Sequence, residues 1–503
     1  MKTPHTLLRL LSAAAVAAVL ALPAAAQVDL SRLVWIGDSE GAGYSANCLT
    51  KRVQVDSPGA VIARANGVDY QQPILSDWGT GGCMVLTSLA PSFGTCPGNA
   101  ACPPPTTLGV PENLALPRPY NNLAIGGCAI HEMLYATTAA DVASTGACKS
   151  TIDLVLRNSV LKIGSQVDQA IALNPSFVIL ANFGNDYLGA VLSGTTVDGV
   201  TVTPLAAFTA DTNAALAKLS ARQKNGIVTS VGNLTNFPFT TTLPPYVTSG
   251  GKVVIVNGAP IPLLGPKGCP TGVPACPIPS NTIVTLNAAG YLPLGFGIPC
   301  AVAPTLPKCN NPLPDSQSAA GPGVLLYADE VALLTQRIAD YNAAIKAAAA
   351  TYGYKFYDIN DWLVRTKAGF DYGGATVSQA FLSGGIASYD GFHLTPIGYA
   401  LLADDIIKFI NANFPGANLK EPDLSTYLYA GGTAGGLSGP FTAPYAWAPM
   451  NDAEKATAIE QIFTLDFASD LAAMIGPRRA SVTPGPSAPV QRHERADRTD
   501  PMP

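Results

Sequence analysis

The fold is decided by residues 33–43, which read LVWIGDSEGAG. The apolar start of this stretch, rich in β-branched and aromatic residues, is typical of a buried strand. Glycine permits the tight backbone with which a strand ends and a helix begins, so Gly37 and Gly41 predict a sharp corner. Such a corner lifts the hydroxyl of Ser39 to the end of a strand, beside free backbone N–H groups. A nucleophile needs that exposure and those oxyanion donors, although an ordinary strand-to-helix turn has the same pattern.

Further apolar segments alternate with helical patterns along the chain. The expected strands are residues 120–127, 176–182, 226–232 and 355–359, and the expected helices are residues 151–174, 205–223, 328–351 and 396–414. Unbroken apolar strands that alternate with helices predict an α/β fold whose parallel sheet is covered on both faces. Ligands of such sheets bind at the carboxyl ends of the strands, where we expect Ser39, Gly127 and Asn185.

The first 26 residues have the pattern of a secretory signal peptide. Lys2 and Arg9 precede an apolar run over residues 10–22, and an Ala-x-Ala cleavage site ends at Ala26. No later stretch approaches the roughly 20 apolar residues of a membrane helix. We therefore expect a secreted or periplasmic protein, with a signal anchor as the alternative.

Composition indicates a compact core with long, turn-rich loops. Charged residues make up 13% of the chain, against 48 glycines and 43 prolines. The net charge of −5 becomes −7 without Lys2 and Arg9, and the absence of a basic patch argues against nucleic acid as a partner.

Changes in composition divide the chain into segments. We expect a catalytic domain over 27–416, with a Pro/Gly/Cys-rich insertion at about 238–323, an extension over 417–476, and a disordered tail over 477–503. The glycine-rich run 429–440 lacks the Gly-x-x-x-x-Gly-Lys pattern of a phosphate-binding loop, so we interpret it as an ordinary loop.

The ten cysteines form an even set, which in an exported protein predicts disulfides. Their spacing suggests the pairs Cys48–Cys83, Cys96–Cys102, Cys128–Cys148, Cys269–Cys276 and Cys300–Cys309. A structural zinc site is the alternative, but the chain has no Cys-x-x-Cys motif and only four histidines.

A serine nucleophile needs a base, and His393 is the strongest candidate. It ends the motif Asp390-Gly391-Phe392-His393, just ahead of a helix that begins near Pro396. A carboxylate three residues earlier can reach Nδ1 of the imidazole and fix its tautomer. A surface aspartate followed by a histidine near a helix cap is the alternative. His131 follows a glycine turn, but its neighbours indicate an ordinary helix start.

An oxyanion needs hydrogen-bond donors beside the nucleophile. The backbone N–H groups of Ser39 and Gly127 are candidates, because glycine lets the backbone approach a substrate closely. Asn185, in Gly184-Asn185-Asp186, can donate from its side-chain amide.

Together these motifs resemble a known family. Gly37-Asp38-Ser39, the run from Asn122 to Gly127, Gly184-Asn185-Asp186 and Asp390-x-x-His393 resemble, in order, the four signature blocks of the SGNH hydrolases, also called GDSL lipases and esterases. The resemblance covers residues 33 to about 410. It implies a flavodoxin-like three-layer α/β/α sandwich and a hydrolase that needs no cofactor or metal.

The resemblance also implies a role for each motif residue. Ser39 would be the nucleophile, His393 the general base and Asp390 the group that orients it. Gly127 and Asn185 would complete the oxyanion hole with the Ser39 N–H. The family name implies leucine after the serine, where this chain has Glu40, a change that bears on the polarity of the pocket.

Residues 37–41 also fit the Gly-x-Ser-x-Gly elbow of α/β-hydrolases. That elbow follows several strands, whereas Ser39 follows the first, and its acid lies apart from the histidine in sequence. We therefore keep the interpretation of a secreted serine esterase or lipase acting on a small-molecule or lipid ester. The alternatives are a carbohydrate O-deacetylase with the same site and a non-catalytic exported binding protein.

The substrate pocket is less well defined by the sequence. Tyr187 and Phe392 flank the catalytic motifs, so we expect them either to contact substrate or to pack in the core. The apolar pieces of residues 283–296 could wall an acyl pocket, which favours a lipid or medium-chain ester over a sugar acetate.

Overall fold

The computed structural model describes residues 28–76, 79–80, 82–88, 92–96, 109–144, 146–316, 318, 321–372, 375–429 and 451–463. Its centre is a four-stranded sheet of β1 (Leu33–Gly37), β6 (Phe177–Ala181), β7 (Gly226–Thr229) and β16 (Lys355–Tyr357), in that order. All three pairings are parallel. The α/β class with a parallel sheet is confirmed.

Residues 121–125 extend the sheet beyond β1. The backbone N–H of Trp35 donates to Asn121 O (2.9 Å), and Leu123 N and Ile125 N donate to Trp35 O and Gly37 O (2.9 and 3.0 Å). These are the hydrogen bonds of a parallel neighbour, yet the pairing amounts to one isolated bridge between Trp35 and Asn122. The strand expected over 120–127 is therefore reduced to a bridge on the edge of β1 that β6 does not occupy.

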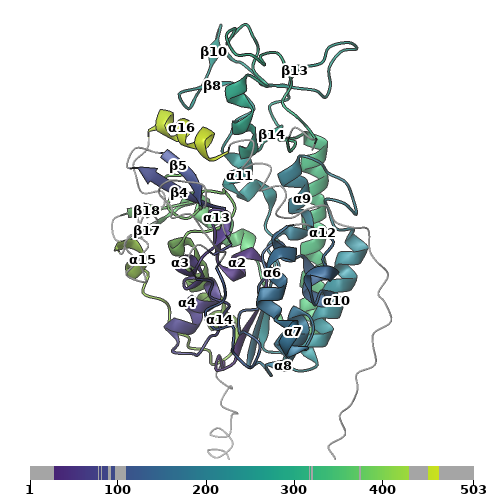
Figure 1. Ribbon diagram of the computed structural model, residues 1–503, viewed down its shortest axis with the longest axis vertical. Helices are drawn as coiled ribbons and strands as arrows, with labels where there is room; N and C mark the ends of the chain where they lie inside the picture. Colours follow the sequence, from purple (N-terminus) through teal and green to yellow (C-terminus); the bar gives the residue numbers. More distant parts are fainter. Residues whose placement is uncertain are drawn as a thin grey trace, which may run out of the picture.

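Helices cover both faces of the sheet (Figure 1). On one face, α4 (Pro58–Ala65) packs on β1 and α14 (Pro396–Asn413) packs on α4 and β16. On the other, α8 (Gln166–Ala172) packs on β1, and α12 (Ala328–Tyr352) packs on β7 and β16 beside α10 (Leu205–Ser220). Strands covered on both faces have no polar side, which explains the unbroken apolar runs of β1 and β6.

The helix expected over 151–174 is wrong as a single element. The chain forms α6 (Ala147–Leu156), α7 (Asn158–Leu161) and α8, with Arg157 at φ +49° between the first two. The Arg157 guanidinium donates to three carbonyls of residues 114–118 and lies 3.9 Å from the ring centre of Tyr120. These tertiary contacts override the local helical pattern.

Some other helices were not expected from the sequence, among them α4, α9 (Asn185–Ser193) and α13 (Ile359–Ala368). The expected helices over 205–223, 328–351 and 396–414 are confirmed as α10, α12 and α14, with ends shifted by up to three residues.

The Pro/Gly/Cys-rich insertion lies between β7 and α12 and forms the top of the molecule in Figure 1. After α11 (Pro238–Thr241) it contains four antiparallel pairs of two-residue strands. These are β8 (Thr248–Ser249) with β9 (Lys252–Val253), β10 (Ile255–Val256) with β11 (Ala259–Pro260), β12 (Leu264–Gly265) with β13 (Cys276–Pro277), and β14 (Ile283–Val284) with β15 (Leu325–Leu326). A small apolar core of its own, separate from that of the sheet, holds the insertion together.

Four of the expected disulfides are confirmed: Cys48–Cys83, Cys128–Cys148, Cys269–Cys276 and Cys300–Cys309. The first of them joins β3 (Cys48–Leu49) to β4 (Cys83–Ser88), which pairs with β5 (Ser92–Cys96). The expected pair Cys96–Cys102 cannot be placed, because Cys102 lies outside the described residues.

Parts of the outer segments are also described. The extension contributes α15 (Ser425–Tyr429) and α16 (Asp452–Ile462), whereas the expected signal peptide and tail lie outside the described residues. In the portions of the chain that can be described, no helix combines the length and apolarity needed to cross a membrane.

Candidate active site

Ser39 begins α2 (Ser39–Ala42), a single turn directly after β1. The corner needs its glycines for space. A Cβ at Gly37 would lie 2.5 Å from Ala181 O, and one at Gly41 would lie 2.2 Å from Trp35 Nε1. The strand-to-helix corner expected from the sequence is therefore present, with the Ser39 side chain largely buried at the carboxyl end of β1.

The order of the strands makes this edge of the sheet a place for ligands. From β1 the chain moves to residues 121–125 on one side and later to β6 on the other. The connections thus leave β1 in opposite directions, and open α/β sheets bind ligands outside the carboxyl ends of strands at such a switch point. Ser39 follows β1 there, and Asn185 opens α9 after β6.

His393 and Asp390 form a buried pair on the loop that enters α14. Asp390 Oδ2 lies 2.7 Å from His393 Nδ1, and the two residues are 0% and 5% exposed. The other oxygen, Oδ1, accepts hydrogen bonds from Ser388 Oγ, Phe392 N and His393 N, each at 2.9 Å. The carboxylate is held from several directions, so it fixes the imidazole and leaves Nε2 as the nitrogen that can act as base.

Electrostatics favour a charged pair at this position. Burial alone would raise the pKa of Asp390, but the charge of His393 and the hydrogen bonds to the carboxylate outweigh burial and hold that pKa well below its usual value. Burial alone would lower the pKa of His393, but Asp390 and, more weakly, Glu40 raise it overall. The charge of Glu40 therefore acts on His393 from the Ser39 corner.

The chain just after α2 holds the histidine loop in place. The backbone N–H of Asn47 donates to Asp390 Oδ2 (2.8 Å), and Ala46 N donates to Ser388 Oγ (3.1 Å). The ring of Tyr44 lies beside the imidazole, with 5.6 Å between ring centres. Residues 44–47 thus bring the serine corner and the Asp390–His393 pair to the same end of the sheet.

The hydroxyl of Ser39 donates to Glu40 Oε2 (3.1 Å), a partner that the sequence did not reveal. Catalytic hydrogen bonds in unliganded enzymes are often made only in the complex with substrate. Asp38 is buried beside this pair, and burial, followed by the charge of Glu40, raises its pKa well above the usual value. Asp38 Oδ2 accepts a hydrogen bond from Phe183 N (2.8 Å), which joins the ends of β1 and β6.

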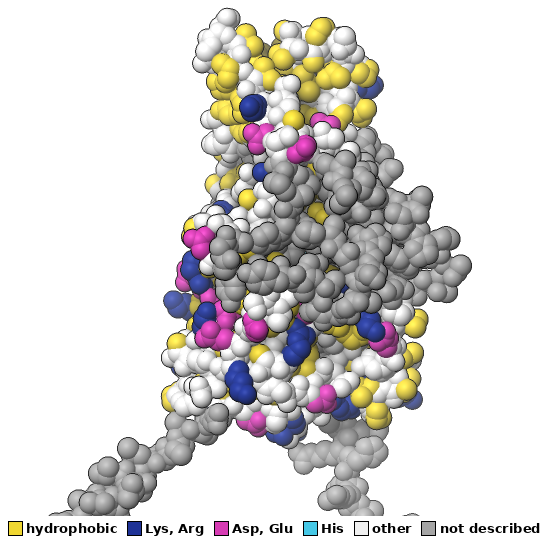
Figure 2. Space-filling view, turned by 90° about the vertical axis from the view of Figure 1, so that its left-hand side faces the viewer, with side chains coloured by type: hydrophobic (Ala, Val, Ile, Leu, Met, Phe, Trp, Pro, Cys, Tyr) yellow, Lys and Arg dark blue, Asp and Glu magenta, His cyan; other side chains and the backbone are white. Residues whose placement is uncertain are grey.

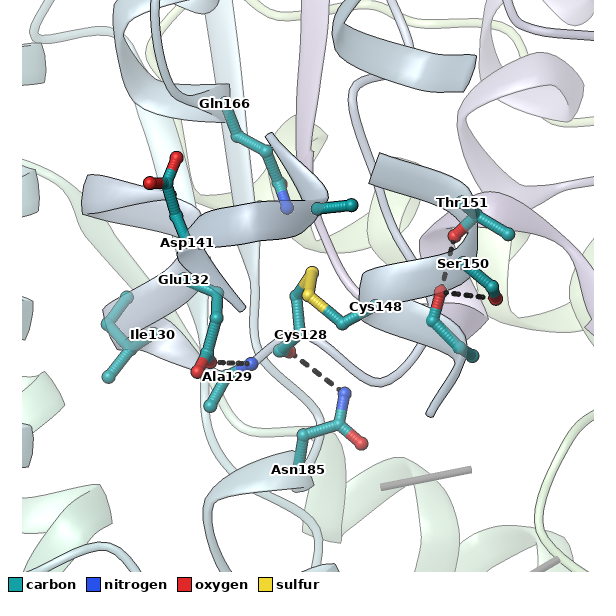
Figure 3. Close-up of a disulfide and its surroundings, with 12 residues drawn as sticks. Cys128, Ala129, Ile130, Glu132, Asp141, Cys148, Ser150, Thr151, Gln166 and Asn185 are labelled. Atoms are coloured by element: carbon teal, nitrogen blue, oxygen red, sulfur yellow. Dashed lines mark hydrogen bonds between the residues drawn. A yellow bond between two sulfur atoms is a disulfide. The ribbon is translucent and has the colours of Figure 1, made fainter. Parts of the chain in front are cut away.

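The two oxyanion candidates lie together. Gly127 adopts φ +75°, a left-handed conformation that favours glycine, and Asn185 Nδ2 donates to the carbonyl of the next residue, Cys128 (2.9 Å; Figure 3). The disulfide Cys128–Cys148 ties this turn to α6. At Gly126, by contrast, a Cβ would lie 2.6 Å from the ring of Tyr44.

His131, the other histidine considered from the sequence, contacts an aspartate of α10. It lies on α5 (Ile130–Tyr135), with its Nδ1 2.9 Å from Asp211 Oδ2 on α10. The hydrogen bond that the imidazole makes to the Asp211 carboxylate raises the pKa of His131.

The two aromatic residues expected near the substrate are packed in the interior. Tyr187 is buried and donates its hydroxyl to Gly232 O (2.7 Å). Phe392 stacks on Phe239, with 4.4 Å between ring centres, and Phe463 after α16 packs against Phe239 from the extension. Each therefore has the core role that the sequence allowed, next to the catalytic motifs.

Some residues that shape the site carried no signal in the sequence. Gly391 has φ +76°, and a Cβ there would lie 2.9 Å from Leu286 Cδ1 and 3.0 Å from Phe239 N. Phe239 N donates to Gly391 O (3.1 Å). The loop that carries Asp390 and His393 is therefore packed against the insertion, and the glycine between Asp390 and Phe392 was the one hint of such a close approach.

No protein family model, curated protein or solved structure matches the chain. Within the portions that the structure covers, no group of three or more His, Cys, Asp or Glu side chains could hold a metal ion. The interpretation of the site therefore depends on its own geometry.

Proposed function

We propose that the protein is a serine esterase of the SGNH type, which hydrolyses carboxylic esters through an acyl-enzyme on Ser39. The observation that carries the proposal is the buried Asp390–His393 pair, with 2.7 Å between Oδ2 and Nδ1, tied through Asn47 to the chain after Ser39. A base whose tautomer is fixed by a buried carboxylate, at the same end of the sheet as a serine on a sharp corner, suits nucleophilic catalysis.

The sheet gives independent support. Residues 121–125, β1, β6, β7 and β16 follow the order 2-1-3-4-5 of flavodoxin-like sheets, and helices cover both faces. A parallel sheet with helices on both faces is compatible with the sandwich that the resemblance to SGNH hydrolases implies. The four motif blocks lie at carboxyl ends of strands or on the loop before α14, as that family requires.

The proposed reaction uses only side chains and backbone of this chain. His393 Nε2 removes the proton of Ser39 Oγ as the oxygen attacks the ester carbonyl, and Asp390 stabilises the imidazolium that forms. The N–H groups of Ser39 and Gly127 and the amide of Asn185 donate to the oxyanion. Collapse transfers the proton from His393 to the leaving alcohol, and water activated by the same base then releases the acid.

Glu40 adds a step to this sequence. The Ser39 hydroxyl donates to Glu40 Oε2, so it must turn to His393 before proton transfer. A carboxylate beside the nucleophile also disfavours substrates with a negative charge close to the ester.

The insertion favours an ester with an apolar acyl group. Leu286, at the start of the 3₁₀ helix η3 (Leu286–Gly290), is in reach of Gly391 next to the catalytic aspartate. Among the described residues, the exposed large apolar side chains are aliphatic with one exception, Tyr135. The apolar side chains of the insertion next to the Asp390 loop favour a lipid or medium-chain ester over a polysaccharide acetate.

Covalent labelling tests the nucleophile. Diisopropyl fluorophosphate, which phosphorylates activated serines, should modify Ser39, as read by peptide mass spectrometry. Labelling should disappear in Ser39→Ala and slow by on the order of 10³-fold or more in His393→Ala. Ser220→Ala, on α10, is the matched control and should label at the normal rate. Labelling of another serine, or none at all, would contradict the proposal.

A further inference from the structure

The top of the insertion exposes a rigid apolar hairpin, which we call the tip (residues 250–260). Its side chains Val253, Ile255 and Val256 are 36%, 57% and 45% exposed. Asn257 and Gly258 turn the hairpin with φ +51° and +80°, the signs that a two-residue type I′ turn requires. Figure 2 shows hydrophobic side chains gathered over this end of the molecule.

Backbone hydrogen bonds hold the tip in one shape. Val254 N donates to Val247 O (2.8 Å), and Ile261 N donates to Val254 O (3.1 Å). Val247 belongs to the insertion core, so the hairpin is anchored to a packed base. The exposed aliphatic side chains are therefore presented in a fixed arrangement, with no ordering cost to be met when they bind.

The segment that carries the tip has a net charge opposite to that of the whole chain, although Asp452 of α16 lies against Gly251. Residues 242–314 contain the lysines Lys252, Lys267 and Lys308 and no aspartate or glutamate, whereas the chain carries a net charge of −5. Lys267 is paired with Glu330 (3.1 Å) below the tip. Lys252 and Lys308 are exposed, and Lys252 directly precedes the apolar residues of the tip.

We propose that the tip docks the protein on an anionic lipid surface. The aliphatic side chains enter the interfacial layer, while Lys252 and Lys308 face the negative headgroups. Weak apolar insertion and a few basic residues reinforce each other at such a surface. A protein partner is the less suitable occupant, because the apolar side chains of the tip are Val and Ile rather than the Trp, Tyr and Arg that dominate protein interfaces.

Docking is independent of catalysis, so the two can be tested apart. Binding of the purified protein to sedimented vesicles is measured with phosphatidylcholine alone and with phosphatidylcholine mixed with phosphatidylglycerol. We expect clear binding to the anionic vesicles and much weaker binding to the neutral ones. The Ser39→Ala variant should bind as the unmodified protein does, which keeps a failure of docking distinct from a failure of the proposed esterase.

Matched substitutions locate the contact. Ile255→Asp/Val256→Asp should weaken binding to the anionic vesicles by on the order of 100-fold, and Lys252→Glu by about tenfold. Val364→Asp is the control for the first, because Val364 on α13 is also 57% exposed. Lys224→Glu, at an exposed position after α10, is the control for the second.

Three outcomes would overturn the proposal. The unmodified protein could bind neither kind of vesicle. The tip variants could bind as tightly as their controls. The protein could form dimers that the tip variants lose, which would identify the hairpin as a self-association surface instead.

Discussion

The sheet region and the insertion are stabilised in different ways. In the sheet region, β1 and β6 are buried along their whole length within one continuous core. In the insertion, strands of two residues surround a small separate core, with the disulfides Cys269–Cys276 and Cys300–Cys309 at its edges. The first arrangement depends on many distant contacts, and the second depends on local links.

The proposed catalytic site lies in the sheet region, and the proposed docking site lies in the insertion. Asp390 and His393 need fixed positions, and they lie on a loop held by residues some 340 positions earlier in the chain. Sites on rigid, well-supported elements keep the geometry that catalysis needs. The tip needs only to present apolar and basic side chains, which a hairpin on a small base can do. Changes at the tip should therefore leave the Asp390–His393 loop largely intact, and changes in that loop should leave the tip intact.

The largest expected effect is on kcat/KM, and it should differ between two Asp→Asn substitutions, one in each region. Asp390→Asn removes the carboxylate that holds His393 in the correct tautomer, so we expect kcat/KM for a short ester to fall on the order of 10⁴-fold. Asp315→Asn, which removes the insertion's carboxylate 3.9 Å from Lys267 Nζ, should leave kcat/KM unchanged. Similar rates in both variants would show that the Asp390–His393 pair is not catalytic.

Truncation of a buried side chain should destabilise only the region in which that side chain lies. Ile179 in β6 and Leu313 in the insertion are both fully buried. Each substitution by Ala should therefore lower the free energy of unfolding of its own region by about 2–5 kcal/mol. Ile179→Ala should lower the free energy of unfolding of the sheet region. Leu313→Ala should speed hydrogen exchange in the insertion alone, as measured by mass spectrometry. Faster exchange across β1 and β6 in Leu313→Ala would mean that the regions unfold together.

Removing disulfides should have smaller effects, and different ones in each region. Cys300→Ser/Cys309→Ser opens a link between residues nine positions apart, so we expect a local loss of about 2–3 kcal/mol in the insertion and normal hydrolysis of short esters. Cys128→Ser/Cys148→Ser should lower kcat, because the turn that carries Gly127 and meets Asn185 loses its tie to α6. Equal loss of activity in both variants would contradict this division.

The smallest expected effect concerns Glu40 and the pH profile. In the proposed mechanism neutral His393 is the base, so kcat/KM should rise with pH as His393 loses its proton. Glu40 raises the pKa of His393, and Glu40→Gln should therefore move this rise to lower pH, by less than about one unit. Glu132→Gln, a change outside the serine corner, should leave the profile in place. A shift to higher pH in Glu40→Gln would contradict the role given to its charge.

The sequence predicted what depends on local patterns. Buried strands show as unbroken apolar runs, and Asp390 and His393 are three residues apart, so one loop brings them together. Four of the five expected cysteine pairs are present, and three of these join cysteines no more than 20 positions apart. The contact of Asn47 with Asp390 spans 343 positions, and the break at Arg157 depends on carbonyls of residues 114–118. Such tertiary contacts have no local pattern, and neither does the hydrogen bond that turns Ser39 toward Glu40.

Hydrolysis of p-nitrophenyl esters, from acetate to palmitate, by the protein and its Ser39→Ala variant tests the role of Ser39 directly. We expect turnover that falls by at least about 10³-fold in Ser39→Ala, with the circular dichroism spectrum unchanged. The preferred chain length would then distinguish a lipase from a deacetylase. No turnover at any chain length, or turnover unaffected by Ser39→Ala, would contradict the assignment of Ser39 as the nucleophile.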